Sequence, residues 1–306
     1  MAPTPNRIGS AARQRIDRLI FLGPATLLLA LFYLGPVIVD LGLAFSDMGR
    51  NLRVTEFTTE NFMRVAGDRR LFGVMGTTLV YVVCTLAIFN VTYGLILALL
   101  TAALPERAGG FFRAVWLLPR MSPSVVYALL WTWVVAPTDY GLLNQIMGGL
   151  GLPRVDLKSD APMLVVVLAN GFVGASFGMI IFTSAIRSIP EHLFHAARVD
   201  GAGGLAIIRH VTLPAIRWQL SFVTLYQALA LLVSFEYIWL ITDGGPFYDT
   251  TVYALYVYNR AFGNGQYAYG AALALGLVAA GVVVALVLWR FFDMRALLQK
   301  PRIEVS

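Results

Sequence analysis

The histidines and one glycine-rich string are the residues of this chain whose types and spacing could bind a metal or a nucleotide. The three histidines are His192, His195 and His210. Two of them are three residues apart, but no thiol and no HExxH partner accompanies them, so no metal site is expected. The string Gly201-Ala-Gly-Gly-Leu-Ala206 satisfies a loose dinucleotide-binding pattern, but no strand precedes it and long apolar segments flank it. Since no Walker A string and no nucleophile with its base occurs either, the sequence predicts a protein that is not an enzyme.

The composition indicates an integral membrane protein. Hydrophobic residues make up 58% of the 306 residues and charged residues 13%, and the mean hydropathy is +0.72, whereas charged residues form about 25% of an ordinary soluble domain. A helix needs about 20 residues to cross the ~30 Å hydrocarbon core, and lipid offers no partner to an unpaired backbone group. We therefore expect an all-α membrane protein with six transmembrane helices, within residues 19–45, 71–104, 111–136, 163–186, 213–241 and 267–292.

Basic residues gather on one side of these predicted spans, which sets the expected orientation. The opposite side has fewer, and acidic residues offset those of its first loop. We therefore expect both termini and the loop at residues 187–217 in the cytosol. The net charge of +6 then follows from topology and implies no nucleic-acid binding. The basic residues of the expected cytosolic side are Arg7, Arg13, Arg15, Arg18, Arg107, Arg113, Arg187, Arg198, Arg209, Arg217, Arg290, Arg295, Lys300 and Arg302.

One membrane domain accounts for most of the chain. We expect a cytosolic N-terminal tail at residues 1–17, the six-helix transmembrane domain at 18–294 and a cytosolic C-terminal tail at 295–306. The first apolar run is longer than the core of a signal peptide, about 7 to 15 residues, and lacks a small-residue cleavage site, so we expect it to be retained. Cys84, the only cysteine, can form no intrachain disulfide.

Seven polar residues inside the predicted spans are singled out, because polar groups are costly there and therefore informative. Each is open to two interpretations, a hydrogen bond between helices or contact with a solute. The string Gly174-Ala-Ser-Phe-Gly178 fits the small-residue packing motif of membrane helices, although Gly174 could also make room for a solute. The seven polar residues are Asn90, Arg120, Ser124, Asn170, Gln227, Ser234 and Glu236.

The polar loop at residues 187–217 carries an ordered pattern of Ala196, Ala197, Asp200-Gly201, nine further residues, Val211 and Leu213-Pro214. This pattern resembles the EAA loop of importer permeases in the ATP-binding-cassette (ABC) class, where a short cytosolic helix, a glycine turn and a second helix dock onto a separate ATPase subunit. Four further strings resemble the carbohydrate-type permeases related to the larger membrane subunit of the maltose importer. These strings are Leu117-Leu-Pro119, Gly141-Leu-Leu-Asn144, Ile189-Pro190 and Thr242-Asp-Gly-Gly-Pro246.

The resemblance implies a type I ABC importer permease fold in which the loop acts as a coupling helix. The glutamate that precedes Ala-Ala in the family is His195 here, and Glu191 stands four residues earlier on the same helix face. Gly201 permits a turn that a Cβ atom would strain. A solvated linker is the simpler alternative for the loop. The residues that the resemblance implies for ATPase coupling are Glu191, His195, Ala196, Ala197, Asp200 and Gly201.

Alignment of the same strings with the maltose-importer subunit brings eight residues onto its sugar-contacting positions. Asn170, Gly174 and Ser124 keep the family residue, whereas the others differ, which implies a solute other than maltose. The eight residues are Arg120, Ser124, Asn170, Gly174, Phe177, Gln227, Leu231 and Ser234.

The function that the resemblance implies is that of a permease subunit of an ABC importer, which carries a sugar or sugar derivative into the cytosol by alternating access. Its expected partners are a second homologous permease, two ATPase subunits and an external solute-binding protein, with membrane lipid around them. We expect no cofactor in this chain, and ATP and Mg in the ATPase subunits. Arg120 favours an acidic solute, because its planar fork suits a carboxylate, sulfonate or phosphate; the alternative is a structural pair with Glu236. The competing function is a secondary transporter driven by an ion gradient, which Asp40 and Glu236 could serve.

Overall fold

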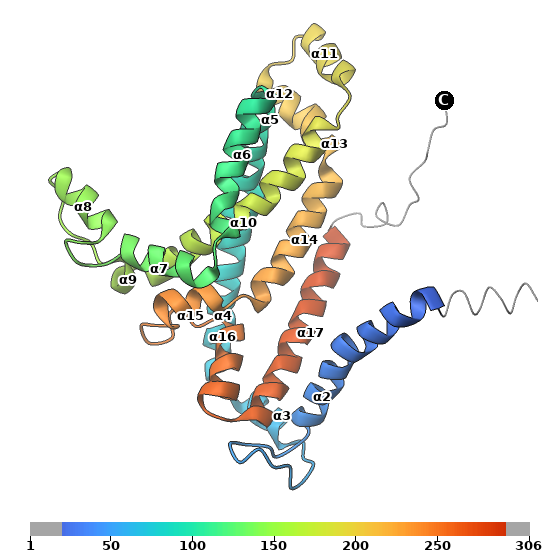
Figure 1. Ribbon diagram of the computed structural model, residues 1–306, viewed down its shortest axis with the longest axis vertical. Coiled ribbons are helices and arrows are strands. Elements are labelled where there is room, and N and C mark those ends of the chain that lie inside the picture. Colours follow the sequence, from blue (N-terminus) through green and yellow to red (C-terminus); the bar gives the residue numbers. More distant parts are fainter. Residues whose placement is uncertain (1–19, 292–306) are drawn as a thin grey trace, which may run out of the picture. The chain divides into compact units, whose positions relative to one another are not determined.

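The computed structural model describes residues 20–291. Over this range the chain folds as two compact units, residues 20–67 with 260–275 and residues 68–259 with 276–291. The regular elements of the described residues are helices (Figure 1), and an isolated β-bridge joins Ser46 and Phe57. The expected tails at residues 1–17 and 295–306 lie outside the described residues.

The first unit begins with a continuous helix, Ile20–Ala44, that matches the first predicted span. After this helix, buried Asn61 fixes the turn of the chain, because its Nδ2 donates to the carbonyl oxygens of Ala44 (3.1 Å) and Ser46 (2.7 Å). The named elements of this unit are η1 (Ala30–Leu34), α2 (Gly35–Ala44), α3 (Glu60–Gly67), most of η4 (Asn259–Gly263) and the first turns of α17 (Tyr267–Phe291).

The second unit is built around α10. Among the long apolar helices α10 is the most buried, because 67% of its most apolar stretch of 18 residues lies inside the structure. Beside it, α4, η2 and α5 form one continuous helix of 34 residues, Arg70–Ala103. The elements of this unit are α4 (Arg70–Cys84), η2 (Thr85–Tyr93), α5 (Gly94–Ala103), α6 (Glu106–Met121), α7 (Ser124–Val134), α8 (Leu142–Gly149), α9 (Leu157–Asp160), α10 (Pro162–Arg187), α11 (Glu191–Val199), α12 (Gly204–Ile207), η3 (Ile208–Thr212), α13 (Leu213–Ala215), α14 (Arg217–Val233), α15 (Glu236–Thr242), α16 (Tyr253–Tyr258) and the remainder of α17.

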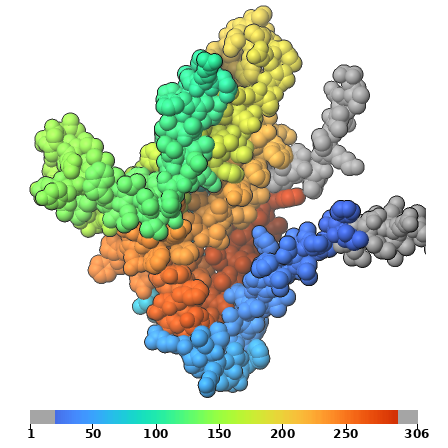
Figure 2. Space-filling view, in the orientation of Figure 1, coloured from blue at the N-terminus to red at the C-terminus, as the bar shows by residue number. Residues whose placement is uncertain are grey.

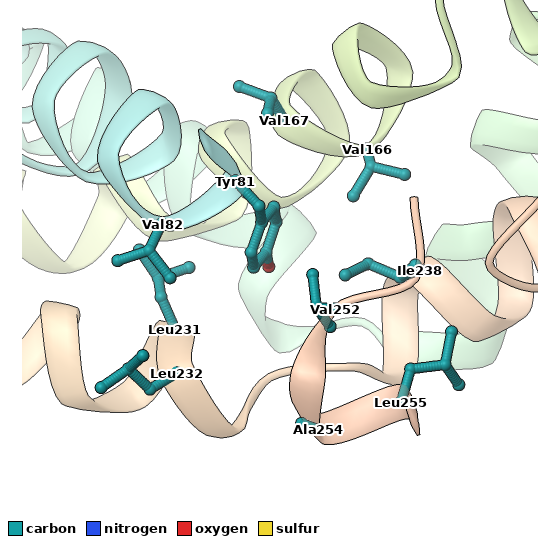
Figure 3. Packing of buried hydrophobic residues seen from close by; sticks show 10 residues of the cluster. All are labelled: Tyr81, Val82, Val166, Val167, Leu231, Leu232, Ile238, Val252, Ala254 and Leu255. Carbon is teal, nitrogen blue, oxygen red and sulfur yellow. The ribbon is translucent and has the colours of Figure 1, made fainter. Parts of the chain in front are cut away.

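A hydrophobic core joins α4, α10, α14, α15 and α16 within the second unit (Figure 3). Tyr81 lies at its centre and is fully buried. Burial of such side chains removes apolar surface from water or lipid and fills the space between the helices at the density of a protein interior. The residues of this core are Tyr81, Val82, Val166, Val167, Leu231, Leu232, Ile238, Val252, Ala254 and Leu255.

Close contact between α10 and η2 depends on the glycines of α10. A Cβ atom at Gly174 would lie 2.0 Å from Oδ1 of Asn90, and one at Gly178 would lie 2.4 Å from the backbone oxygen of Asn90. Small residues allow helix backbones to approach in this way. The packing interpretation of the Gly174 to Gly178 string is therefore confirmed.

The third predicted span, residues 111–136, is not one helix. It is divided between α6, with 16 residues, and α7, with 11, and Ser122 between them is extended with ψ 145°. Pro123 accounts for this break, because a proline disfavours the helical conformation in the residue before it. Neither helix alone has the roughly 20 residues that a straight membrane span needs.

The fifth predicted span, residues 213–241, is also broken. The helix Gly204–Ala215 meets α14 at a bend of 70°, and α14 stops at Val233 before the short α15 begins. Pro214 therefore lies before the bend. Over residues 20–291 four helices have the length and composition of a continuous span, and a fifth if the bent pair is one span. The third and fifth predicted spans are therefore each divided between two helices, and the number of six transmembrane helices stays a prediction.

Candidate functional site

The polar loop at residues 187–217 forms two helices joined by a tight glycine turn. At the end of α11 the N–H of Gly201 donates to the carbonyl of Arg198 (3.1 Å), and the N–H of Ala202 donates to the carbonyl of Ala197 (2.9 Å). Gly201 has a φ of +79°, the left-handed conformation that glycine adopts without strain at a helix C-terminus. Figure 1 shows α11 beyond the ends of α5, α6 and α10, and the same segment projects in Figure 2. The expected helix, glycine turn and second helix are therefore present, and the second helix starts at Gly204.

One face of α11 lines a hollow of about 650 Å³ whose other walls come from α5, α10, α12 and η3. Glu191, His195 and Arg198 line this hollow, whereas Ala196 and Ala197 do not. The prediction that Glu191 and His195 share a helix face is therefore confirmed. That either of them contacts an ATPase subunit stays a prediction.

Two apolar side chains at the tip of the loop were missed from the sequence. Val199 is 88% exposed and Leu205 is 80% exposed, on either side of the Asp200-Gly201 turn. Exposed apolar side chains that gather on a projecting segment are typical of a protein contact surface. Their position next to Asp200-Gly201 was the available signal in the sequence.

At the base of the loop Glu106 joins two arginines. Nη2 of Arg113 lies 3.0 Å from Oε1 of Glu106, and Nη1 of Arg187 forms an ion pair with its Oε2. Because Arg187 is the last residue of α10, these contacts connect the start of α6 to the helix that leads into the loop. The Glu106 side chain is 71% exposed, so solvent weakens the pairs and their role is to orient the two helix ends.

Arg120 and Ser124 lie on either side of the break in the third predicted span. The guanidinium carbon of Arg120 lies 5.4 Å from the centroid of the Phe177 ring, a cation–π contact. The hydroxyl of Ser124 donates to Oε1 of Glu236 at 2.5 Å. Over the part of the chain that the structure describes, Arg120 has no ion pair with an acidic side chain. The proposed structural pair between Arg120 and Glu236 is therefore absent.

Asn170 and Ser234 belong to a hydrogen-bond network between helices. Nδ2 of Asn170 donates to the hydroxyl oxygen of Tyr81 and to Oγ of Ser234 (3.1 Å). The Tyr81 hydroxyl in turn donates to Ser234 Oγ at 3.3 Å. Sequence reasoning missed Tyr81, although a tyrosine in the middle of a predicted span was a signal for a buried hydroxyl that needs a partner.

Gly174, Gln227 and Leu231 also lie in helix packing. Nε2 of Gln227 donates to the carbonyl of Gly174 at 3.0 Å, and Leu231 is a buried residue of the core in Figure 3. Beside Gly174, Oδ1 of Asn90 is buried without a hydrogen-bond partner. The structure thus brings Arg120 to Phe177 and Ser124 to Glu236. The other predicted solute contacts are engaged with their own protein neighbours, namely Asn170, Gly174, Gln227, Leu231 and Ser234.

The histidines and the glycine string that open the sequence analysis have other surroundings. Within residues 20–291 no cluster of three or more His, Cys, Asp or Glu side chains could hold a metal ion. Nδ1 of His210 lies 3.0 Å from the carbonyl of Ala206, one helical turn earlier. The string at residues 201–206 forms the glycine turn and the start of α12.

Known proteins with similar sequences are ABC transporter permeases. Residues 90–303 match the family described as "Binding-protein-dependent transport system inner membrane component". A probable ABC transporter permease of Pyrococcus horikoshii is 30% identical over 283 residues, which cover 88% of this chain and 92% of that protein. The diacetylchitobiose uptake system permease of Streptomyces coelicolor is 33% identical over 187 residues, which cover 58% of this chain and 52%, about half, of that relative.

A similar fold occurs in a solved structure. The crystal structure of a bacterial ABC transporter involved in the import of the acidic polysaccharide alginate matches with a TM-score of 0.81 and 21% identity, over 94% of this chain and 99% of that one. At this identity the likeness shows the fold alone, which is the type I importer permease fold. The family match covers most of the chain and includes the whole loop at residues 187–217. The chain therefore belongs to the family of binding-protein-dependent transport system inner membrane components.

Proposed function

We propose that this chain is one of two membrane subunits of an ATP-driven importer and moves a sugar or sugar derivative from an external binding protein into the cytosol. Members of its family are permease subunits, and separate subunits hydrolyse ATP. The chain itself is therefore not an enzyme. The S. coelicolor relative, which takes up diacetylchitobiose, supports a sugar as the solute class.

The projecting loop is the observation that carries this proposal. α11 ends in a turn that Gly201 fixes, and the turn presents exposed Val199 and Leu205. A short helix with a defined end and apolar side chains at its tip suits docking onto an ATPase subunit. The ion pair between Glu106 and Arg187 ties the base of the loop to α6, so motion of α11 is passed to two helices of the bundle.

Alternating access follows from breaks in the helices. When ATP binds, the two ATPase subunits close and α11 moves with them. The breaks at Pro123 and Ser234 are the points where α7 and α15 can change direction relative to α6 and α14. ATP hydrolysis then resets the arrangement, because the open and closed states differ in their contacts with the ATPase pair.

The proposed partners follow from this mechanism. They are a second homologous permease, two ATPase subunits that bind ATP and Mg, an external solute-binding protein and the lipid of a bacterial inner membrane. The loop lies in the cytosol, because Arg107, Arg187 and Arg198 are at this end of the helices and basic residues favour the cytosolic side. The same rule puts both termini in the cytosol.

For the solute we propose that Arg120 binds an acidic group. Arg120 is exposed and its only described partner is the Phe177 ring, while Glu236 already accepts a hydrogen bond from Ser124. An unpaired guanidinium within a membrane span costs about 2.5 to 3.5 kcal/mol on insertion scales, so the group faces water or a charged partner. A carboxylate, sulfonate or phosphate on a sugar fits its planar fork.

Purification and transport assays test the function. In mild detergent the chain should copurify with an ATPase, and uptake by the reconstituted complex should stop with vanadate but continue with an uncoupler while ATP is maintained. Uptake that resists vanadate and stops with an uncoupler would support the ion-gradient-driven transporter instead, a function that the family of this chain does not favour.

A further inference from the structure

A row of aromatic rings extends from the Arg120 site toward the coupling loop. Trp218, Phe222 and Tyr226 are spaced by four residues on α14, so they lie on one face of this helix. The ring centroids of Trp218 and Phe222 are 5.8 Å apart with an interplanar angle of 8°, and those of Phe222 and Tyr226 are 6.1 Å apart at 20°. The rings are therefore near-parallel neighbours.

Phe177 of α10 continues the row and joins it to Arg120. Its ring centroid lies 4.9 Å from that of Tyr226, with an interplanar angle of 24°. The guanidinium carbon of Arg120 lies 5.4 Å from the centroid of the Phe177 ring. From Trp218 to Tyr226 the helix rises about 12 Å, at 1.5 Å per residue. The row thus connects a residue at the coupling-loop end of α14 with a charged residue well inside the predicted span.

The row is accessible in this chain. Trp218 is 41% exposed and Tyr226 is 47% exposed, and Phe177 and Phe222 are half-buried. The half-buried Phe177 and Phe222 also pack against a hydrophobic core that includes the buried Val223. The aromatic side chains therefore have free surface on the side that the hydrophobic cores do not use.

The charge at the end of the row indicates that water, not lipid, lies next to it. Arg120, whose guanidinium contacts the Phe177 ring, is exposed. Charged side chains at this depth face the bundle interior or an aqueous cavity. A surface that borders such a charge and presents aromatic rings suits a sugar, whose hydroxyl groups are hydrated and whose ring has an apolar C–H face.

We propose that Trp218, Phe222, Tyr226 and Phe177 form a stacking track along which the sugar rings of the solute pass between Arg120 and the coupling-loop end of α14. The proposal rests on the proposed function and adds a path and three residues to it. Rings whose centroids are 4.9 to 6.1 Å apart offer successive apolar contacts at short intervals, so a sugar ring can move from one to the next without a large loss of contact. Arg120 holds the acidic group at the start of the track.

Accessibility to a charged thiol reagent tests whether the track is aqueous. The experiment uses the assembled importer in proteoliposomes, with Cys84→Ala as the background and Phe222→Cys as the probe position. The matched control is Leu79→Cys, an exposed apolar position at 63% on α4. We expect 2-sulfonatoethyl methanethiosulfonate to label Phe222→Cys at least about tenfold faster than Leu79→Cys, because a sulfonate does not enter hydrocarbon. Equally slow labelling of both positions would mean that lipid or the second permease covers the row, and would overturn the proposal.

Transport by ring-deleting variants tests the stacking. Phe222→Leu keeps an apolar side chain but removes the planar face, whereas Phe222→Tyr keeps the ring. We expect Phe222→Leu to lower uptake about threefold to tenfold, the size of an aromatic contact, and Phe222→Tyr to retain it. The probe is radiolabelled diacetylchitobiose or digalacturonate, whichever the native importer accumulates with its binding protein. Native uptake by Phe222→Leu would overturn the track. An importer that accumulates neither probe would count against the proposed sugar function, and the labelling result still decides the track.

Discussion

The hydroxyl of Ser124 donates a hydrogen bond to the carboxylate of Glu236 at 2.5 Å, and this contact joins the first residues of two helices that begin after breaks. Ser124 starts α7 after the Pro123 break, and Glu236 starts α15 after α14 ends. Because Glu236 is held by Ser124, Arg120 is left with the Phe177 ring. Arg120 and Glu236, which the sequence offered as a possible ion pair, therefore contact different residues.

The first prediction concerns Arg120. Arg120→Gln should lower uptake of an acidic sugar about tenfold or more, because a charged hydrogen bond contributes about 1.5 to 3 kcal/mol, and should leave uptake of a neutral sugar unchanged. Arg120→Lys keeps the charge but loses the planar fork, so its uptake of the acidic sugar should lie between that of the native protein and that of Arg120→Gln. Radiolabelled uptake of digalacturonate and diacetylchitobiose measures this. Undiminished uptake of the native solute by Arg120→Gln, or a native solute without charge, would refute the role of Arg120.

The second prediction separates structural from solute-binding polar residues. Asn170→Ala should destabilise the subunit by about 1 to 3 kcal/mol, because it leaves the buried Tyr81 hydroxyl without its donor. Ser124→Ala, which removes the more exposed hydrogen bond to Glu236, should cost less. Thermal unfolding in detergent compares the two variants. If Asn170→Ala unfolds like the native protein and only solute affinity drops, Asn170 is a solute contact and the network reported above is not its main role.

The third prediction concerns the contact between α10 and η2. Gly178→Ala should destabilise more than Gly174→Ala, because its Cβ meets the backbone of Asn90 at 2.4 Å, whereas the Cβ of Gly174 meets a side-chain oxygen that can rotate away. Overpacking of this kind costs about 1 to 3 kcal/mol. Gly76→Ala is the control, since nothing lies within 4 Å of its Cβ. Equal melting temperatures for the variants at positions 178 and 76 would show that the helices are less closely packed than described.

The fourth prediction concerns pH and Asp47, which follows the first long helix. A side-chain hydrogen bond from Thr55, and then the backbone N–H of Thr55, lower the pKa of Asp47 below its ordinary value of 3.8. A lowered folded-state pKa contributes stability that is present above the unfolded value and lost as pH falls through the folded value. Hydrogen exchange of residues 46–58 should therefore approach that of Asp47→Asn only below about pH 4. A difference between native and Asp47→Asn that persists unchanged in acid would contradict this account.

The pattern of long apolar runs predicted the first, second, fourth and sixth helices well, because burial of backbone in lipid requires helices of a minimum length. The break at Pro123 could also have been predicted, since proline acts on its immediate neighbour. The bend of 70° before α14 has a local signal in Pro214, because proline kinks or ends a helix, but the size of the bend does not follow from the sequence. Such a bend depends on tertiary packing around the loop.

The site shows the same division between local and tertiary information. The Gly201 turn follows from one residue and its backbone preference, and it was predicted. The network of Tyr81, Asn170 and Ser234 joins residues from three distant parts of the chain, whereas the sequence left open whether Asn170 and Ser234 contact the solute or another helix. A polar residue in a span must find a partner, but the sequence does not say whether the partner is a ligand or another helix.

Coupling through the Gly201 turn is the central claim, and the solute-stimulated ATPase activity of Gly201→Asp tests it most directly. Gly201→Asn is the matched control, because Asn and Asp have side chains of the same size and share the backbone strain of a Cβ atom at a φ of +79°. Neither Cβ meets an atom of this chain within 4 Å, so only the added negative charge differs. The account predicts that both variants assemble with the ATPase subunits at least in part, that Gly201→Asn retains most of the solute-stimulated activity, and that Gly201→Asp loses it together with uptake. Normal stimulation and uptake in Gly201→Asp would mean that the loop is only a linker.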